Sequence, residues 1–463
     1  MKNIVQKIYF QKLTPVVFGI LLITVGCENF TETELPRTEM STESVFTDEK
    51  STEAVISGIY SRMISSLGFA GGYFYSITNQ AGLSSGELMS LRPPNAFQDF
   101  TLTSDDTSIS NYLWNEPYSY IYTVNNVLEA VENDNHSTAE NRNRISGEAH
   151  FIRAFCYFYL INMFGDVPLH LTTDYQKNST ASRTDTKVIY DQIIKDLLIA
   201  VAYLPEDYTI YGGERIRPTT AVAKAFLSRV YLYTENWNEA ERLADEVIRM
   251  DGIYALTEDL NQVFLKDSKE AIWQLKPVRS GLNTFEGFWF IPPGNFAVSA
   301  EISDELLMAF ESGDKRVDDW INTADNGQFS WSYPYKYKIR SGAIVSEYSV
   351  VIRLAELLLI RAEARAQTGK FQESLSDVNI IRDRAGLSAL EFSTSEALLQ
   401  DIYKERELEL FAEWGHRWFD LKRTGRAEEV LGSRPNWNES RQLYPIPLDE
   451  ITRNSNISQN PGY

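Results

Sequence analysis

One short string in this sequence has the spacing of a catalytic serine. Gly82-Leu-Ser84-Ser-Gly86 fits the pattern G-x-S-x-G, in which a sharp turn between a buried strand and a helix exposes the serine hydroxyl as a nucleophile. The residues just before it, 75–80 (YSITNQ), have little of the apolar character that a buried strand needs. A turn of small residues is therefore the favoured interpretation, and a serine hydrolase using Ser84 is kept as a remote alternative.

Other residue types that carry catalysis or bind metals do not form recognisable sites. No histidine belongs to an H-E-x-x-H spacing, and the sequence has no phosphate-binding loop or glycine-rich dinucleotide motif. Adjacent acids such as Asp105-Asp106 are expected in a chain with 64 acidic residues, and adjacency does not place an acid and a base across a cleft. We expect no catalytic residue, no metal site and no cofactor. The histidines considered are His136, His150, His170 and His416.

Aromatic residues are abundant, with 9 Trp, 25 Tyr and 24 Phe, and many lie in loop-like segments. Exposed rings suit sugars, whose C–H faces are apolar while their rims carry hydroxyls. The same rings suit a protein partner, because Tyr and Trp dominate interface anchors, and they also suit a core beneath long loops. These three interpretations stay open for each residue. The predicted ligand-binding residues are Tyr73, Phe74, Tyr75, Trp289, Trp331 and Tyr333.

Two pairs of helices with similar patterns are expected to position these rings, one at 219–235 and 237–250, the other at 350–367 and 371–385. Each pair has a helix rich in alanine and leucine, a short break and then an aromatic residue. Small residues at fixed positions let two helices pack closely, as in tetratricopeptide hairpins. Two pairs alone would not bury a core, so further helices are expected at 111–132, 144–164 and 187–204.

Residues 251–349, between the two pairs, have a different composition. Glycine, proline and aromatic residues become more frequent there, and helical periodicity is lost. We expect a long irregular insertion with a few short strands, such as Glu270-Ala-Ile-Trp-Gln-Leu275, and ordered loops of this length are usually functional. The predicted fold class is mainly α, with tetratricopeptide-like helix pairs in an α-α superhelix, packed against this loop-rich region.

The N-terminus has the layout of a cleaved export signal. Three lysines and no acid precede the apolar run 16–25 (VVFGILLITV), which is too short to span a bilayer and is followed by Gly26-Cys27. A cysteine directly after a small residue predicts a lipoprotein, with a signal peptide over 1–26 and lipid attached to the thiol of Cys27. Thr24 stands where a lipobox usually has leucine, and a plain secreted protein is the alternative.

The rest of the chain is predicted to be an acidic domain on a short tether. Residues 27–42 are polar and acidic and predict the tether, and 43–463 the folded domain, with halves at about 43–235 and 236–463. Without the signal peptide the chain has 41 basic and 64 acidic residues, a net charge of −23. This charge argues against nucleic-acid binding and against a basic membrane patch. Cys156, the other cysteine, is expected to be buried and inert.

Several strings together carry a family resemblance. The longest is 405–423 (ERELELFAEWGHRWFDLKR). The others are 353–364 (RLAELLLIRAEA), 379–387 (NIIRDRAGL), 443–447 (LYPIP) and 459–463 (QNPGY) in the C-terminal half, and 147–155 (GEAHFIRAF), 164–168 (FGDVP) and 217–225 (RPTTAVAKA) in the N-terminal half. In these strings and their order, the chain from Cys27 to Tyr463 resembles the SusD/RagB family of outer-membrane nutrient-binding lipoproteins.

The resemblance implies a role as well as a fold. It implies a lipid-anchored protein, facing outward from the outer membrane, that caps a SusC-like TonB-dependent transporter and captures an oligosaccharide, or in some members a peptide. It also indicates structural ion pairs, because Arg406, Glu409, Arg417 and Asp420 alternate in sign at helical spacing, with His416 as a structural donor. Family members often have Asp-Glu near position 86, whereas this chain has Gly86-Glu87.

Overall fold

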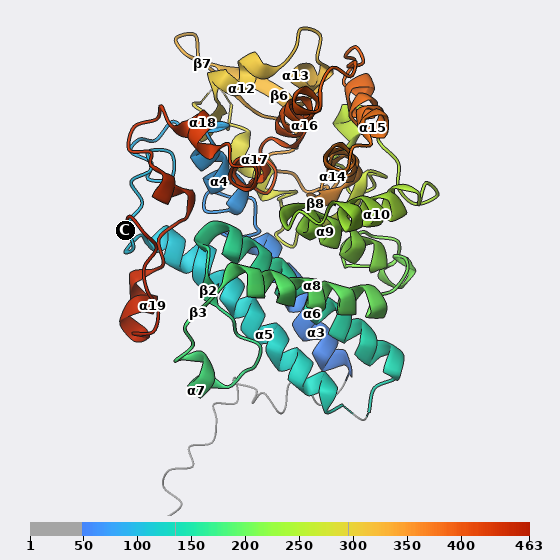
Figure 1. The fold of residues 1–463 in the computed structure, drawn as a ribbon, viewed down its shortest axis with the longest axis vertical. Coiled ribbons are helices and arrows are strands. Elements are labelled where there is room, and N and C mark those ends of the chain that lie inside the picture. The colour runs from blue at the N-terminus through green and yellow to red at the C-terminus, as the bar shows by residue number, and fades with distance from the viewer. Residues whose placement is uncertain (1–48, 135, 295) are drawn as a thin grey trace, which may run out of the picture. The chain divides into compact units, whose positions relative to one another are not determined.

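Helices that pack side by side in chain order make up most of the fold (Figure 1). The computed structural model describes residues 49–463 except 135 and 295, so the predicted signal peptide, Cys27 and the tether lie outside the described residues. Each helix of the stack contacts the next one. The stack consists of α5 (Asn115–Glu132), α6 (Ala139–Phe164), α8 (Thr186–Tyr203), α9 (Thr220–Tyr233), α10 (Trp237–Ile248), α14 (Leu354–Gln367), α15 (Phe371–Arg384) and α16 (Ser395–Leu410).

The helix ends follow from local sequence. Thr138, Thr219 and Thr394 precede α6, α9 and α16, and each side chain accepts a hydrogen bond from a backbone N–H in the first turn. Between α14 and α15, Gly369 has a φ of 80°, a conformation that glycine adopts without strain. The small residues predicted to allow close helix packing are buried, including Ala240 of α10. The predicted helix pairs and the three further helices are therefore confirmed, with ends shifted by a few residues.

The predicted start of one helix is wrong by more than the usual uncertainty of one or two residues at a helix end. The helix expected from 350 begins only at Leu354, because Ser349–Arg353 forms strand β8. This strand pairs antiparallel with β4 (Ala271–Leu275), which is the strand predicted at 270–275, and both strands are buried along their whole length. The apolar run 350–352 therefore serves a two-stranded sheet beneath the helices.

The insertion between α10 and β8 is more regular than predicted. It contains α11 (Phe285–Phe290), α12 (Asp304–Ala309) and α13 (Lys315–Trp320), each with a Ser, Thr or Asp at its N-cap. Its other strands form two-stranded antiparallel sheets: β5 (Ala300–Ile302) with β1 (Leu88–Ser90), and β6 (Ile321–Asp325) with β7 (Ser330–Pro334). A further small sheet joins β2 (Val167–Pro168) and β3 (Arg183–Thr184). In Figure 1, α12, α13, β6 and β7 lie at the top.

Buried charges join the helical stack to this insertion. Arg353, 1% exposed at the end of β8, contacts Glu270 at 2.9 Å, Glu409 of α16 at 2.5 Å and Glu413 at 2.9 Å. Lys336, which follows β7, contacts Glu413 at 2.5 Å. Each carboxylate is therefore buried together with a cation, which is the condition under which a buried charge is tolerated.

The ion pairs predicted for the longest family string are partly confirmed. Arg406 and Asp420 pair at 2.8 Å and both are buried. Arg417 instead pairs with Glu407 at 3.0 Å, and Glu409 belongs to the network around Arg353. The buried His416 lies 4.0 Å from Glu356, and burial lowers its pKa well below the usual range, so the ring is neutral inside the fold.

The environment of Cys156 agrees with the predicted inert thiol. Cys156 of α6 is fully buried, and burial raises the pKa of its thiol well above the ordinary value.

Within residues 49–463, gaps aside, no helix combines the length and the apolar character needed to cross a bilayer. Over the same range, no group of three or more His, Cys, Asp or Glu side chains is arranged to hold a metal ion.

Candidate ligand-binding surface

Four of the six predicted ligand-binding residues come together where α11 packs against the loop before α4 (Ile77–Ser85). The ring centroid of Trp289 lies 5.0 Å from that of Tyr73 and 5.1 Å from that of Phe74. Trp289 is only 8% exposed, and its indole N–H donates to Oδ1 of Asn79 at 3.0 Å. The indole therefore supports the loop from beneath, and the rings of the loop are the more accessible part of this cluster.

Tyr75 extends the cluster outward. Its ring lies 4.5 Å from that of Phe74 and stacks on Tyr112, with centroids 4.3 Å apart and planes 6° from parallel. Tyr73, Phe74, Tyr75 and Tyr112 are all half-buried, so each ring keeps an accessible part. We call these four residues the Tyr75 surface. Phe74, Tyr75 and Tyr112 follow one another by ring contacts, and Tyr73 is joined to them through Trp289, so the surface is of the kind that packs against the apolar face of a ligand ring.

Tyr112 was missed by the sequence analysis. It lies on the π-helical segment η1 (Ile109–Trp114), far from the Tyr73–Tyr75 string along the chain, and the aromatic residues that follow it fall in the predicted helix 111–132 and not in a loop-like segment. A close backbone approach brings it to the loop: a Cβ on Gly68 would lie 2.4 Å from Cβ of Tyr112. Glycine at this position is therefore what allows the two rings to stack.

The other two predicted residues, Trp331 and Tyr333, lie on β7 in a separate cluster. Tyr333 is 5% exposed and packs with Val298 and Ala324, so it belongs to the core. Trp331 is half-buried, and its ring lies 6.0 Å from that of Phe329, which is 56% exposed. We call Phe329, Trp331 and Tyr333 the hairpin cluster. Among the described residues no ring contact joins it to the Tyr75 surface, so a single six-residue platform is not formed.

The segment of α11 nevertheless lies against both clusters. Phe288 contacts Tyr73 at 5.9 Å between ring centroids, and Ile291, just after the helix, packs against the hairpin cluster. The guanidinium of Arg340 donates to the carbonyl of Ile291 at 2.8 Å and lies 4.3 Å from the centroid of the Phe288 ring. The two aromatic clusters are thus held by one short helix, although their rings do not touch.

Ser84 does not have the environment of a nucleophile. It lies inside α4, with Ser76 as the N-cap and Gly86 as the C-cap at a φ of 79°. The expected turn of small residues is therefore the last turn of a helix, and within residues 49–76 no strand leads into it. Ser84 is 1% exposed, and its hydroxyl forms a 3.0 Å hydrogen bond with the hydroxyl of Tyr444. A substrate carbonyl cannot reach a hydroxyl that is buried and bonded in this way.

Glu87, the acid whose role the sequence left open, is a buried structural group. It is 3% exposed, and its Oε1 accepts a hydrogen bond from the backbone N–H of Ala412 at 3.2 Å. Its Oε2 is buried and has no partner among the described residues. Burial raises the pKa of Glu87 to about 7, which the Ala412 hydrogen bond only partly opposes.

Replacing Glu87 by glutamine should stabilise the protein at alkaline pH but not at acidic pH. The pKa is higher in the folded than in the unfolded chain, so the contribution of Glu87 to stability is fully present below pH ~4.5 and is lost as the pH rises through about 7. A glutamine side chain cannot ionise, so the melting temperature of Glu87→Gln should exceed that of the wild type at pH 8 and match it near pH 5. The exposed Glu206→Gln is the matched control, and an equal shift at both pH values would contradict the prediction.

Comparison with known proteins identifies the family to which this architecture belongs. Residues 77–232 match a family described as starch-binding and associating with the outer membrane, and residues 230–463 match the SusD family. The second match alone covers half of the chain. The chain belongs to the SusD family.

Relatives match between 69% and 98% of the chain, and solved structures superpose on about nine-tenths of it. SusD-like protein P2 of Formosa agariphila is 27% identical, over 98% of this chain and 100% of its own length. The starch-binding protein SusD of Bacteroides thetaiotaomicron is 24% identical, over 69% of this chain and 73% of its own. A SusD superfamily structure from Parabacteroides distasonis, 25% identical, superposes with a TM-score of 0.78 over 92% of this chain and 100% of that one. A laminarin-binding SusD-like protein, 24% identical, gives 0.74 over 90% and 100%. The predicted mainly α, tetratricopeptide-like fold is confirmed.

Proposed function

We propose that this SusD-family protein binds an oligosaccharide at the cell surface and delivers it to a TonB-dependent outer-membrane transporter, without catalysing a reaction on it. The observation that carries the proposal is the Tyr75 surface, which leaves four half-buried rings accessible beside one another. Support also comes from relatives named for binding starch and laminarin, which are both glycans.

The chemistry of the Tyr75 surface favours a sugar over a charged ligand. Stacked phenol rings offer apolar faces for the C–H groups of a pyranose, and the tyrosine hydroxyls offer donors and acceptors for its rim. The nearest buried polar groups are engaged in holding the loop, since the side-chain amides of Asn79 and Gln80 both donate to the carbonyl of Phe74. The loop is therefore fixed before a ligand arrives, which lowers the entropy cost of binding.

Isothermal titration of the purified protein against starch-derived and laminarin-derived oligosaccharides, with a peptide mixture as the comparison, tests the proposal. We expect binding to at least one glycan series. Binding of peptides alone would support the alternative that the same architecture carries non-sugar nutrients. Hydrolysis of any of these ligands by the wild type, abolished in Ser84→Ala, would contradict the assignment as a binding protein.

The location and the partner are part of the proposal. The predicted lipid on Cys27 would hold the protein at the outer membrane, where the transporter also lies. Fifteen residues, 28–42, would then separate the lipid from the folded domain, and at ~3.3–3.6 Å per residue they could extend roughly 50 Å. This reach would allow the domain to tilt over its transporter while the lipid stays in the membrane.

Cys27→Ala should release the protein from the membrane without changing its fold. The described residues form their core without Cys27, so the variant should keep the melting temperature and the ligand affinity of the wild type. Cell fractionation with an antibody against the folded domain measures the distribution, and Cys156→Ala is the matched control for loss of a thiol. A Cys27→Ala variant that stays in the membrane fraction would show that the anchor is not this residue.

A further inference from the structure

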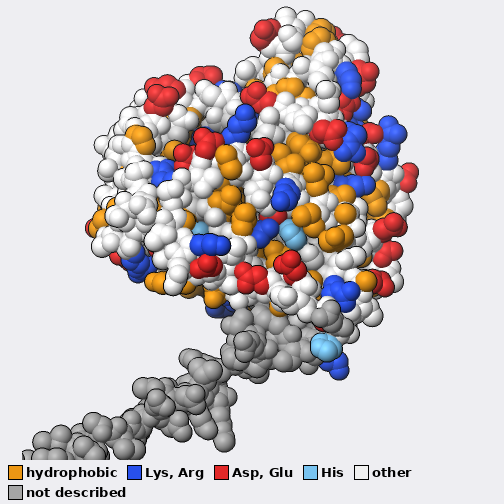
Figure 2. All heavy atoms as spheres, turned by 60° about the horizontal axis from the view of Figure 1, so that its bottom comes forward, with side chains coloured by type: hydrophobic (Ala, Val, Ile, Leu, Met, Phe, Trp, Pro, Cys, Tyr) orange, Lys and Arg blue, Asp and Glu red, His pale blue; other side chains and the backbone are white. Residues whose placement is uncertain are grey.

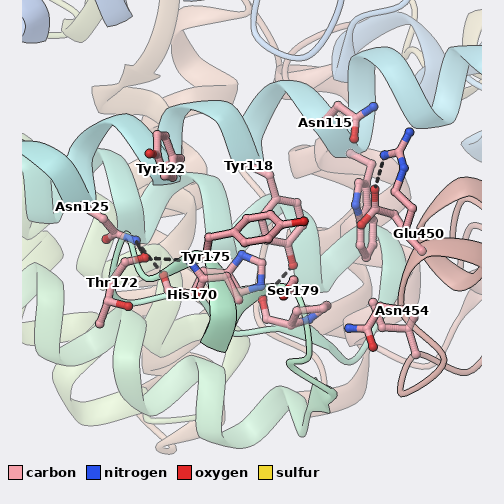
Figure 3. Close-up of a pocket in the computed structure, with 15 residues that line it drawn as sticks. Asn115, Tyr118, Tyr122, Asn125, His170, Thr172, Tyr175, Ser179, Glu450 and Asn454 are labelled. Atoms are coloured by element: carbon pink, nitrogen blue, oxygen red, sulfur yellow. Dashed lines mark hydrogen bonds and ion pairs between the residues drawn. The ribbon is translucent and has the colours of Figure 1, made fainter. Parts of the chain in front are cut away.

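A cavity of about 460 Å³ begins at Trp114, two residues after Tyr112 of the Tyr75 surface, and extends along α5 (Figure 3). It is formed by α5, the segment that follows β2, α7 (Tyr175–Asn178) and α19 (Leu448–Arg453). In Figure 1 these elements lie in the lower part of the view, whereas α4 and β7 lie in the upper part. Its volume falls in the range of about 300–1,000 Å³ that is typical of small-molecule sites, and no residue of the Tyr75 surface or the hairpin cluster lines it.

Aromatic side chains form both the floor and the mouth of this cavity. Trp114 is 2% exposed, and its ring lies 5.1 Å from that of Tyr118, which lies 5.3 Å from the ring of His170. At the mouth, Tyr122 is 53% exposed and Tyr175 is 81% exposed. Figure 2 shows hydrophobic side chains, tyrosines included, gathered on this end of the molecule among scattered acids and bases. Exposed rings at the mouth of a preformed cavity indicate a binding site.

Polar contacts hold the walls in place without a ligand. The buried amide of Asn125 donates to the carbonyl of His170 at 3.0 Å and accepts from Arg153 at 2.9 Å. The hydroxyl of Tyr118 donates to the carbonyl of Pro168 at 2.7 Å. Nε2 of His170, in contrast, is buried without a well-formed hydrogen bond, and the backbone of Asn178 is a polar group beside this ring. A ligand hydroxyl in the cavity would satisfy this nitrogen.

The charges of the lining favour a neutral ligand. Apart from His170, the lining contains one acidic residue, Glu450, and one basic residue, Arg453. Their side chains pair at 3.4 Å. A phosphate or carboxylate ligand would require an excess of basic groups, and the lining has none. The remaining polar residues include both donors and acceptors, as sugar hydroxyls require, although the amide of Asn178 already donates to the carbonyl of Thr172 and that of Asn454 to the carbonyl of Ala181. These polar residues are Asn115, Thr172, Asn178, Ser179 and Asn454.

We propose that this cavity is a second site, which binds a short neutral oligosaccharide against Tyr122 and Tyr175. The ligand class rests on the proposed function, whereas the position rests on the cavity alone. Figure 3 shows Tyr118 below α5, with Asn115 and Tyr122 along the same helix and Glu450 and Asn454 on the C-terminal segment, so polar and aromatic groups come from two sides. Two separate sites on one rigid domain let a long glycan be held at two points, which raises its apparent affinity.

Titration with laminaritriose and maltotriose, using the full domain, tests the second site. The double variant Tyr122→Ala/Tyr175→Ala should lower the affinity for one of these trisaccharides at least about tenfold, since it removes both aromatic side chains at the mouth of the cavity. Tyr75→Ala should weaken only the binding event at the Tyr75 surface and leave the event at this cavity in place. Tyr203→Ala is the matched control, because Tyr203 is 42% exposed on α8 and does not line this cavity.

Hydrogen–deuterium exchange gives the position independently of affinity. With the trisaccharide bound, residues 115–125 and 168–179 should be protected in the wild type and unprotected in the double variant. Trisaccharide binding that is unchanged in the double variant, or protection confined to residues 66–80, would overturn the second site and leave the proposed function standing. Preference of this site for trialanine would overturn the sugar assignment. Failure of the wild type to bind any glycan would overturn the proposed function together with the second site.

Discussion

Arg353→Ala is expected to lower the free energy of unfolding by about 3–5 kcal/mol, the range found when one partner of a buried ion pair is removed. The arginine is 1% exposed and contacts three buried carboxylates, those of Glu270, Glu409 and Glu413. Each carboxylate also contacts Arg384 or Lys336, so alanine would remove one positive charge from a balanced buried network and leave one negative charge uncompensated. Urea unfolding followed by circular dichroism, at pH 7 and constant salt, measures the loss.

An exposed arginine with similar contacts is the control. Arg242 pairs with Glu239 at 2.6 Å and with Glu246 at 2.5 Å, but its side chain is 51% exposed. Arg242→Ala should therefore cost less than ~1 kcal/mol, because solvent screens exposed pairs. Equal losses for the two variants would show that the buried network does not stabilise the fold.

The network also resists acid. Burial acts to raise the pKa of Glu409, but Arg384, Arg353 and Arg316 lower this pKa to well below the usual range.

The helices were predictable because their signals are local. Apolar periodicity, small residues at contact positions and a capping threonine or glycine all lie within one or two turns of the element that they define. The strand β8 was not predictable, because the run 350–352 continues the apolar pattern of α14. Only the pairing of this run with β4 shows that it is extended. Tertiary pairing decided the structure of these residues, and no single-segment pattern records such pairing.

The candidate sites show the same limit. Tyr73 and Trp289 were both named as aromatic candidates and do contact each other, but the sequence could not tell that Tyr333 of β7 is buried. Tyr112 stacks on Tyr75 only because the backbone at Gly68 allows it. The cavity between α5 and α19 joins residues from distant parts of the chain, from Trp114 to Asn454. Ligand sites made of distant loops depend on the fold, and composition indicates only their residue types.

Tyr75→Ala should lower the affinity for the glycan about 10- to 30-fold, equivalent to roughly 1.4–2 kcal/mol, while the melting temperature changes little. The ring is half-buried and stacks on Tyr112 at 4.3 Å, so its removal takes away the middle of the Tyr75 surface but no core contact. Titration with the glycan that the wild type binds best measures the loss. Phe392→Ala is the matched control, because Phe392 stacks on Phe371 at 5.0 Å and is 38% exposed elsewhere on the surface.

Trp331→Ala decides between the two aromatic clusters. If the Tyr75 surface alone binds the glycan, this variant should keep the affinity of the wild type, since no ring contact among the described residues joins the hairpin cluster to Tyr75. Equal losses in Tyr75→Ala and Trp331→Ala would mean that one ligand spans both clusters across α11. If neither substitution affects glycan binding but either one weakens co-purification with the transporter, the rings form a protein interface. That outcome would assign the accessible aromatic surface to the partner and leave the cavity beside Tyr122 and Tyr175 as the remaining glycan site.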